Sequence, residues 1–436
     1  METIQVLGKA ARESFFSAKP NAGAAQTMFY VILFILAMVA LGYIIYYAVE
    51  ESRKNPIMSP DNVALVQGQR QAAIKGDTEL VGDKSLKDLV TNLAIGERYL
   101  VNLCPLTASL GGYVGAGDTG VFYSEFYLQN ALRAGIRSFV LPISVYSDDN
   151  KRPPNWPYSG NPAVVARDGQ GKIISLNGLS VKQFCIDLMR YNSQNPTQSS
   201  EPILLFILAD TKHLPDKVRS EKVYASILSK LASDLDVIPS NSRLTTIGGY
   251  GSAVGSQNEA NILTQVPLSD LQGKILIFTD FDTTIGLKPA YSGLGPTLNT
   301  YTNFTLKPVI ADNAGLSVGS GARSIVLADI SGSKVNWTDQ ARTVIHVTND
   351  YNLSIPNVGA VDGALKKGIQ VIPVPFYTSQ AIEDIKPIWD LWKGYAWRIK
   401  EPDARYLKPD PVVPAKPSAK MNARVDSNLQ PGQMTV

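Results

Sequence analysis

Hydrophobic and polar positions follow two different patterns along most of this chain. From about residue 87, short apolar runs that predict buried strands are separated by longer segments with a helical period. The expected strands are Tyr99–Leu103, Ser138–Val145, Ala163–Ala166, Ile203–Ala209, Ile275–Thr279, Ser324–Ala328, Val344–Val347 and Ile369–Val374. The expected helices are Tyr123–Ala134, Val181–Tyr191, Ser220–Leu235 and Ala381–Lys393. Strands that alternate with helices predict an α/β fold with a parallel sheet, here a (β/α)8 barrel of the TIM type.

One segment follows neither of these two patterns. From Phe29 to Val49 the chain is apolar and carries no charge, and a helix of this length spans about 30 Å, the thickness of a bilayer's hydrocarbon core. Tyrosines near both ends suit the two membrane interfaces. The pattern therefore predicts a single-pass membrane protein that is anchored in the membrane through Phe29–Val49.

The same patterns divide the chain into five regions. We expect a polar segment at 1–27, a transmembrane helix at 28–49, a juxtamembrane linker at 50–85, the barrel at 86–405 and a disordered Pro- and Lys-rich tail at 406–436. Three basic residues precede the apolar segment and two follow it closely, so the positive-inside rule predicts a cytosolic N-terminus. The large C-terminal domain would then lie on the non-cytosolic side, in a cellular or a virion membrane.

Charge and cysteine content exclude some classes of function. The formal net charge is +3 and no cluster of Lys and Arg is present, which argues against nucleic acid as a partner. Cys104 and Cys185 lie in no CxxC pair and beside no histidine, so a zinc site is not expected. Their apolar surroundings favour two buried thiols over a disulfide. His213 and His346 are the chain's only histidines, which limits acid–base chemistry.

Seven segments resemble one known family and follow each other in its order: Arg98–Ala108, Phe126–Ile143, Asn161–Gly169, Glu201–His213, Val266–Phe278, Lys367–Thr378 and Gly394–Arg405. The run VPLSDLQGKILIF is similar to that family's Pro-x-x-Leu-x-x-Lys-Ile-Leu-Ile step, and KGIQVIPVPFYT to its Gly-Cys-Gln-x-Val-Ala-Leu-Asn-Phe-Gln-Thr run. The family is phosphoinositide-specific phospholipase C, whose X and Y halves form a PLC-like phosphodiesterase barrel. The resemblance covers about residues 86–405 and implies two catalytic histidines, a calcium ion and a phosphoinositide substrate.

The resemblance also implies that the catalytic groups have been lost. The family's histidines and calcium-binding carboxylates align with Pro105, Leu106, Val140, Pro142 and Arg167 (or its neighbour Asp168). Proline, valine and leucine neither ligate a hard cation nor transfer a proton, so we expect a pseudoenzyme without metal or cofactor. Calcium would be a cofactor only if the site were active. The proposed role is that of a structural or interaction module.

Two alternatives keep some chemistry. A phosphoinositide or inositol-phosphate binder would use Arg167, Lys212 and Lys151 as its phosphate contacts at the mouth of the barrel. An active phosphoric diester hydrolase would use Asp210 with His213, which follow one expected strand. The partner at the mouth would be a phospholipid headgroup or a protein. Four aromatic residues in the loops expected there could contact it: Tyr113, Tyr146, Trp156 and Tyr158.

A rival motif follows the strand Ile275–Thr279. There Asp280 and Asp282 form the Asp-x-Asp-x-Thr pattern of haloacid-dehalogenase-type phosphatases, with the first aspartate as nucleophile and the second as general acid. That family also needs a later lysine and an acidic pair, and Val347–Asp350 is a poor substitute for them. A loop with two solvated carboxylates is the favoured interpretation.

Overall fold

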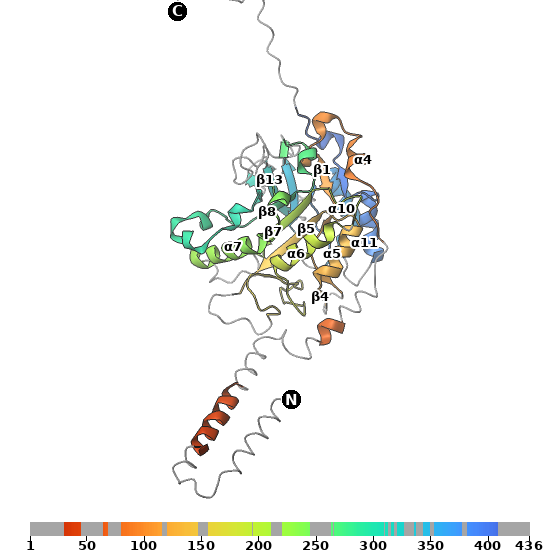
Figure 1. The fold of residues 1–436 in the computed structure, drawn as a ribbon. Coiled ribbons are helices and arrows are strands. Elements are labelled where there is room, and N and C mark those ends of the chain that lie inside the picture. The colour runs from red at the N-terminus through yellow and green to blue at the C-terminus, as the bar shows by residue number, and fades with distance from the viewer. Residues whose placement is uncertain are drawn as a thin grey trace, which may run out of the picture.

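The computed structural model describes residues 30–44, 64–68, 80–115, 120–146, 156–193, 195–210, 220–244, 263–264, 266–308, 310–312, 315–317, 321–326, 335–336, 343–348, 353–376 and 382–408. Structural statements below refer to these residues. Figure 1 shows strands at the centre of the large domain, with helices packed around them.

The central strands pair in parallel, one after another, around a ring. The first five are β2 (Thr107–Ala108), β5 (Ser138–Ser144), β7 (Ile203–Ala209), β8 (Ile275–Thr279) and β9 (Phe304–Thr305). The ring continues through β10 (Lys307–Pro308), β13 (Gly321–Val326) and β15 (Thr343–Thr348). Parallel bridges from His346 to Val371 and from Val374 to Ala108 return it to β2. The fold is thus α/β, with a parallel sheet that is consistent with the predicted barrel.

The expected helices are present on the outside of the ring (Figure 1). They are α5 (Ser124–Arg133), α6 (Val181–Asn192), α7 (Glu221–Leu235) and α11 (Ile382–Trp389). The Ser180 and Ser220 side chains cap the backbone N–H groups at the start of α6 and α7, which fixes where these helices begin. The pattern missed α10 (Val358–Lys366), whose two glycines weaken its helical signal.

Two expected strands of the ring are wrong. In Tyr99–Leu103 the chain forms the 3-10 helix η3 (Leu100–Asn102), and β1 (Leu103–Pro105) then pairs with β16 (Trp397–Ile399) outside the ring. In Ala163–Ala166 the strand β6 (Ala163–Val164) pairs antiparallel with β5. Its expected place between β5 and β7 does not exist, because these two strands pair directly with each other. The ring instead contains β9 and β10, between β8 and β13, whose apolar runs are too short to stand out in the sequence.

On one side of the ring of strands, no helix of the described residues covers the outer face. The connection from β8 to β9 consists of 3-10 turns, chiefly η8 (Ile285–Leu287) and η9 (Pro289–Leu294). Beyond it lies a small sheet of β11 (Ile310–Asp312), β12 (Gly315–Ser317) and β14 (Val335–Asn336). Two short strands, β3 (Tyr113–Val114) and β4 (Val121–Phe122), pair with each other between β2 and α5, and α4 (Leu86–Val90) precedes the ring.

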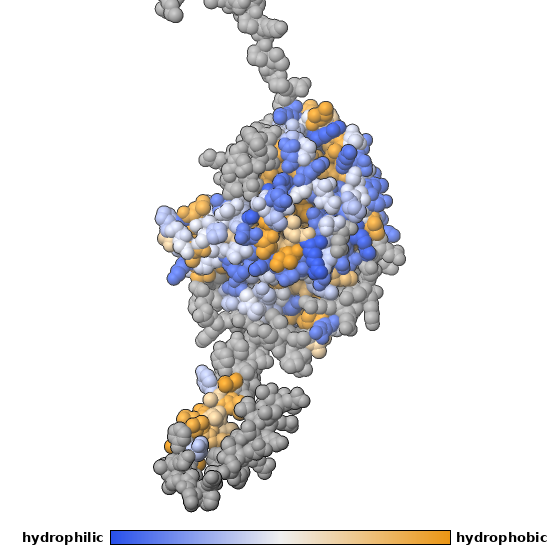
Figure 2. Space-filling view, viewed as in Figure 1, coloured by the Kyte–Doolittle hydropathy of each residue, from blue (hydrophilic) through white to orange (hydrophobic). Residues whose placement is uncertain are grey.

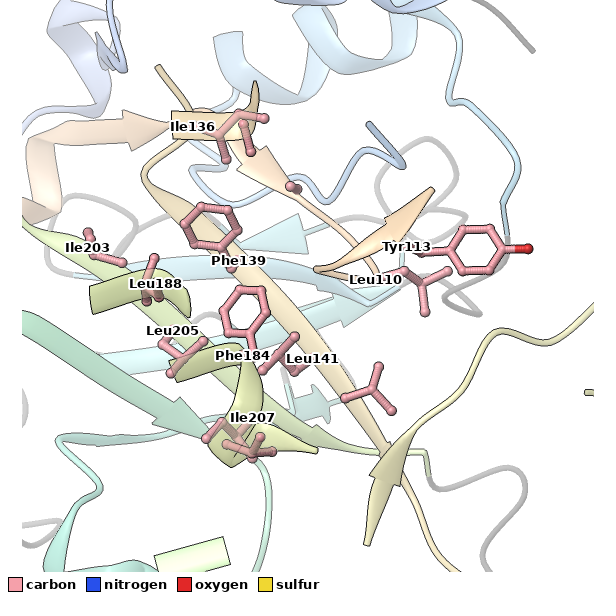
Figure 3. Packing of buried hydrophobic residues seen from close by; sticks show 14 of the residues in the cluster. Leu110, Tyr113, Ile136, Phe139, Leu141, Phe184, Leu188, Ile203, Leu205 and Ile207 are labelled. Carbon is pink, nitrogen blue, oxygen red and sulfur yellow. The ribbon is translucent and has the colours of Figure 1, made fainter. Parts of the chain in front are cut away.

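Alternate residues of each strand pack on opposite faces. Phe139, Leu141 and Leu205 point outward against Phe184 and Leu188 of α6 (Figure 3). Residues of the opposite parity fill the interior, which is therefore a packed core and not a channel. The interior holds an aromatic column, in which Phe206 and Phe278, and Phe278 and Phe304, stack with ring centroids 4.5 Å apart.

Residues 30–44 form a helix inside the predicted membrane segment. Its large apolar side chains are exposed, from 39% for Val31 to 68% for Tyr43, and Figure 2 shows them gathered along this helix. In the described part of the chain, no helix has both the length and the apolar character required to cross a bilayer. The remaining residues of the predicted span, 28–29 and 45–49, lie outside the described residues.

The described contacts of the barrel extend past both predicted boundaries. Gly82 donates its backbone N–H to the carbonyl of Arg133, and Gln198 donates its side-chain amide to the carbonyl of Lys84. At the other end, Tyr406 exchanges two hydrogen bonds with the Asn102 side chain. Residues 80–85 and 406–408 therefore pack with the barrel, while 409–436 lie outside the described residues.

Candidate functional site

Three polar residues stand where neighbouring strands of the ring end. Ser144 is the last residue of β5, Asp210 follows β7 and Asp280 follows β8. In barrels of this type the chemistry is located at the carboxyl ends of the parallel strands, which we call the mouth. The sequence analysis singled out both aspartates but missed Ser144, whose only signal is its position at the end of an expected strand.

Asp210 is held by two neighbours. Its Oδ2 accepts a hydrogen bond from Ser144 Oγ at 2.7 Å and an ion-paired hydrogen bond from Arg167 Nε at 2.9 Å. Arg167 also donates Nη1 to the carbonyl of Gly171 at 2.8 Å. The two side chains are 15% (Arg167) and 13% (Asp210) exposed, so solvent screens their attraction only partly. The carboxylate at the mouth is thus neutralised by the chain's own guanidinium.

The segment that supplies Arg167 folds back on itself next to β5. Its two arms meet at the antiparallel bridge between Arg167 and Ile173, and Asp168 Oδ1 accepts the backbone N–H groups of Gln170 and Lys172 to close the turn. On one face, Ala163 and Val165 pack with Trp156 in a small separate cluster. This packing fixes the backbone on both sides of Arg167 and holds its side chain over Asp210.

The loop aromatics are less available than the sequence indicated. Trp156 and Tyr113 are each only 1% exposed, Trp156 against Tyr146 and Tyr113 against Phe122. Tyr146 and Tyr158 are partly buried against the Trp156 cluster. These four aromatic rings therefore stabilise the mouth by packing.

The Asp-x-Asp-x-Thr motif has structural roles here. Asp280 Oδ1 accepts the Ala209 backbone N–H at 2.7 Å, which ties the ends of β7 and β8 together, and burial raises the pKa of Asp280 to about 6. Asp282 Oδ1 accepts both the N–H and the Oγ1 hydroxyl of Thr284, closing a turn. The described residues contain no group of three or more His, Cys, Asp or Glu that could hold a metal ion.

His346 is excluded from acid–base chemistry by its position. It is fully buried in the barrel interior, where its ring lies 5.1 Å from that of Phe206. Neither ring nitrogen has a hydrogen-bond partner among the described residues, and burial lowers the pKa of His346 to about 3. The imidazole is therefore neutral at physiological pH. The other candidates, Lys151, Lys212 and His213, lie outside the described residues.

Four of the positions that the resemblance aligns with the family's catalytic groups carry apolar residues. Val140 and Pro142 are buried within β5, Val140 in the same interior cluster as Phe206. Pro105 and Leu106 precede β2, so they lie on the side where the strands of the ring begin and not at the mouth. The mouth end of β2 carries Ser109 instead, whose buried hydroxyl has no hydrogen-bond partner in the described part of the chain.

The two cysteines are free, as expected. Cys104 and Cys185 are both buried, and burial raises the pKa of both thiols, that of Cys104 to about 12. Buried thiols of raised pKa are poor nucleophiles and poor metal ligands.

Comparison with known proteins finds similar solved structures only. No protein-family model and no curated protein matches the chain. The phospholipase C structure L. pealei PLC21 is 13% identical, with a TM-score of 0.42 over 72% of this chain and 39% of that protein. The chain thus spans well under half of that protein's length.

Shorter bacterial enzymes are matched over almost their whole length. A calcium-dependent phosphoinositol-specific phospholipase C from Pseudomonas sp is 13% identical, with a TM-score of 0.35 over 71% of this chain and 97% of that one. A histidine-to-tyrosine mutant of the phosphatidylinositol-specific phospholipase C from Staphylococcus aureus is also 13% identical, with a TM-score of 0.35 over 73% of this chain and 100% of that one.

Proposed function

We propose that this chain is a membrane-anchored pseudoenzyme, a phospholipase C-like barrel that serves as a structural or interaction module. The observation that carries the proposal is the bonding of Asp210 to Arg167 and Ser144. Both bonds are made to Oδ2, and the paired guanidinium offsets the negative charge that would attract a calcium ion, so the pairing competes with calcium binding. Asp280, the other carboxylate at the mouth, accepts a backbone N–H from the neighbouring strand.

The membrane anchor is supported by the exposure of the 30–44 helix. Its apolar side chains pack against no described core, and burying such side chains stabilises by about 25 cal/mol for each Å² removed from water. A bilayer is the environment in which all sides of an apolar helix are buried at once. The barrel would follow on the non-cytosolic side, with the mouth free for a protein or lipid partner.

The decisive experiment measures hydrolysis. The full-length chain in detergent micelles would be incubated with labelled phosphatidylinositol and its bisphosphate, with calcium and then with a chelator, and soluble inositol phosphates counted. We expect no release above a heat-inactivated sample. Calcium-dependent release that disappears in Asp210→Asn would overturn the pseudoenzyme proposal and assign catalysis to the mouth.

The alternative is a phosphoinositide or inositol-phosphate binder without turnover. Of its three proposed cations only Arg167 is described, and two of its donor nitrogens are already engaged. Vesicle co-sedimentation separates the two functions, because a binder loses affinity for bisphosphate vesicles in Arg167→Ala, Lys212→Ala or Lys151→Ala. The interaction module gives the same sedimentation in all three variants and the parent, with no gain when bisphosphate is added to the vesicles.

A further inference from the structure

A cleft lies at the end of the barrel opposite the mouth, where the strands of the ring begin. It has a volume of about 720 Å³ and is bounded by α4, the 95–99 segment, the turn before β7 and η7 (Leu268–Leu271). All of these precede strands of the ring, so the cleft is remote from Asp210 and Arg167.

The cleft has an apolar rim that no described residue covers. Ile95 is 81% exposed, the largest exposed fraction of any large apolar side chain among the described residues. Leu407 is 63% exposed and lies against Gly96, and Val90 is partly exposed within the lining. Exposed apolar surface of this kind, at the edge of a cleft, is typical of interaction sites.

The described part of the barrel domain ends at this rim. Lys408 is its last residue, and the Lys408 backbone N–H donates to the carbonyl of Gly96 at 2.9 Å. The Lys408 ammonium group lies 5.8 Å from the centroid of the Tyr99 ring, which lines the cleft. A Cβ atom at Gly96 would lie 3.1 Å from Leu407 Cδ1, so glycine lets the chain run close along this wall. Residue 409 therefore starts beside the cleft.

The six residues that follow suit a docking segment. Residues 409–414 read Pro-Asp-Pro-Val-Val-Pro, and all but Val412 are either a proline or the residue before one. Proline fixes its own φ and restricts the preceding residue to extended conformations, so such a segment loses little conformational entropy when it docks. Grooves with apolar and aromatic linings bind proline-rich segments in the polyproline II conformation. At about 3.1 Å per residue, six residues extend about 19 Å, which is enough to cross the cleft.

We propose that this cleft is the docking site of the chain's own segment 409–414. The two valines cover Ile95 and the apolar lining, and the Asp410 carboxylate faces Lys87 and Arg98, the two cations of the lining. Proline has no backbone N–H, so docking takes few donors away from water. Because the segment follows a residue that is fixed at the rim, docking is intramolecular and proceeds at a high effective concentration. The proposal is independent of any function at the mouth.

The test measures how fast a water-soluble maleimide reaches the cleft in the full-length chain in detergent. Ser200→Cys places a thiol at an exposed position of the lining, and Ser292→Cys places one at an exposed position of η9 as the matched control. The native Cys104 and Cys185 are buried and react slowly. We expect Ser200→Cys to react at least about tenfold more slowly than Ser292→Cys, because the docked segment covers it in most molecules.

The decisive comparison changes the segment itself. Val412→Asp together with Val413→Asp removes the apolar contacts, and should speed the reaction of Ser200→Cys at least about tenfold while leaving that of Ser292→Cys unchanged. Equal rates for Ser200→Cys with and without the two substitutions would overturn the proposal, because the cleft would then be open or covered by something else.

A disulfide trap locates the segment. Ser200→Cys combined with Ala415→Cys, one residue past the segment, should form an intramolecular disulfide under mild oxidation, seen as a shift in mobility on a denaturing gel without reductant. Ser292→Cys combined with Ala415→Cys is the control and should form none. A disulfide-linked band at twice the mass, in place of the intramolecular one, would mean that the segment docks on a second copy and would overturn the proposal.

Discussion

The two ends of the barrel satisfy their buried charges differently. At the mouth, Asp210 has both a hydroxyl and a guanidinium on one oxygen. At the opposite end, which we call the base, Glu201 Oε1 accepts the backbone N–H of Leu86, and the buried Trp397 and Arg137 side chains lie close to the carboxyl group. Burial therefore raises the pKa of Glu201 to about 7 and lowers that of Arg137 to about 10. An inserted segment supplies the cation that pairs with Asp210, while desolvation dominates at Glu201 and also at Asp280 of the mouth.

A substitution in the barrel interior, which separates the two ends, should have the largest effect on the free energy of unfolding. Phe206 is fully buried and stacks on both Phe278 and His346. Phe206→Ala should lower the free energy of unfolding by about 3–5 kcal/mol, because it removes apolar burial and leaves a cavity. Urea denaturation measures the change. Leu287→Ala, at a side chain 57% exposed, is the control and should cost less than about 0.5 kcal/mol.

Burial of Glu201 at the base should make the stability of the fold depend on pH. The pKa of Glu201 is raised from 4.5 to about 7 in the folded protein, so folding disfavours its ionised form. Its contribution to stability is therefore greatest below pH 4.5 and is lost as the pH rises through 7. Between about pH 5 and pH 8 the parent should lose on the order of 2 kcal/mol more unfolding free energy than Glu201→Gln.

Urea denaturation of the two proteins at both pH values gives the comparison. Equal pH slopes in the parent and in Glu201→Gln would show that the carboxyl group is hydrated or paired in solution. In that case the contrast between the two ends would disappear.

The mouth should depend on its ion pair. Arg167→Ala leaves Asp210 with Ser144 as its remaining bonded partner of the two, and should lower the free energy of unfolding by about 1–2 kcal/mol. Arg190→Ala, which breaks a pair between side chains 66% and 45% exposed, should cost less than about 0.5 kcal/mol. Urea denaturation measures both changes. If both variants lower the free energy of unfolding by the same amount, the Arg167 pair is no stronger than a surface pair.

The smallest effect is expected when the pH is changed around the interior histidine, His346. Burial lowers the pKa of His346 to about 3, so its ring should stay neutral from about pH 5 to pH 8. The ring C–H signals of His346, assigned by comparison with His346→Gln, should not move over this range in NMR spectra. A titrating signal would show that water reaches the interior between the two ends.

Much of the fold could be predicted from local pattern. The strands Ile203–Ala209 and Ile275–Thr279 have the predicted bounds because each is a continuous apolar run buried on both faces. The β9–β10 segment could not be predicted, because NFTLKP has no comparable run and becomes part of the ring through pairing with β8 and β13. The same limit explains Ala163–Val164, which was expected in the ring and pairs antiparallel beside it.

The candidate site was predictable only in part. Asp210 and Asp280 stand out because each directly follows an apolar strand, and that is a local signal. Ser144, Arg167 and Asp210 are 23 and 43 residues apart along the chain, and nothing local indicates that they bond to one another. The raised pKa of Glu201 could not be predicted either, because its burial is visible only once the surroundings are known.

The sequence by itself determined which segments are buried, since apolar runs and their period follow from the hydrophobic effect acting on each residue. It also determined that histidine is scarce, with His213 and His346 the only two. Only the tertiary structure decided that Arg167 pairs with Asp210, that His346 is sealed in the interior and that Glu201 is buried. Charge, hydration and hydrogen bonding depend on neighbours distant in sequence, and folding alone brings those neighbours together.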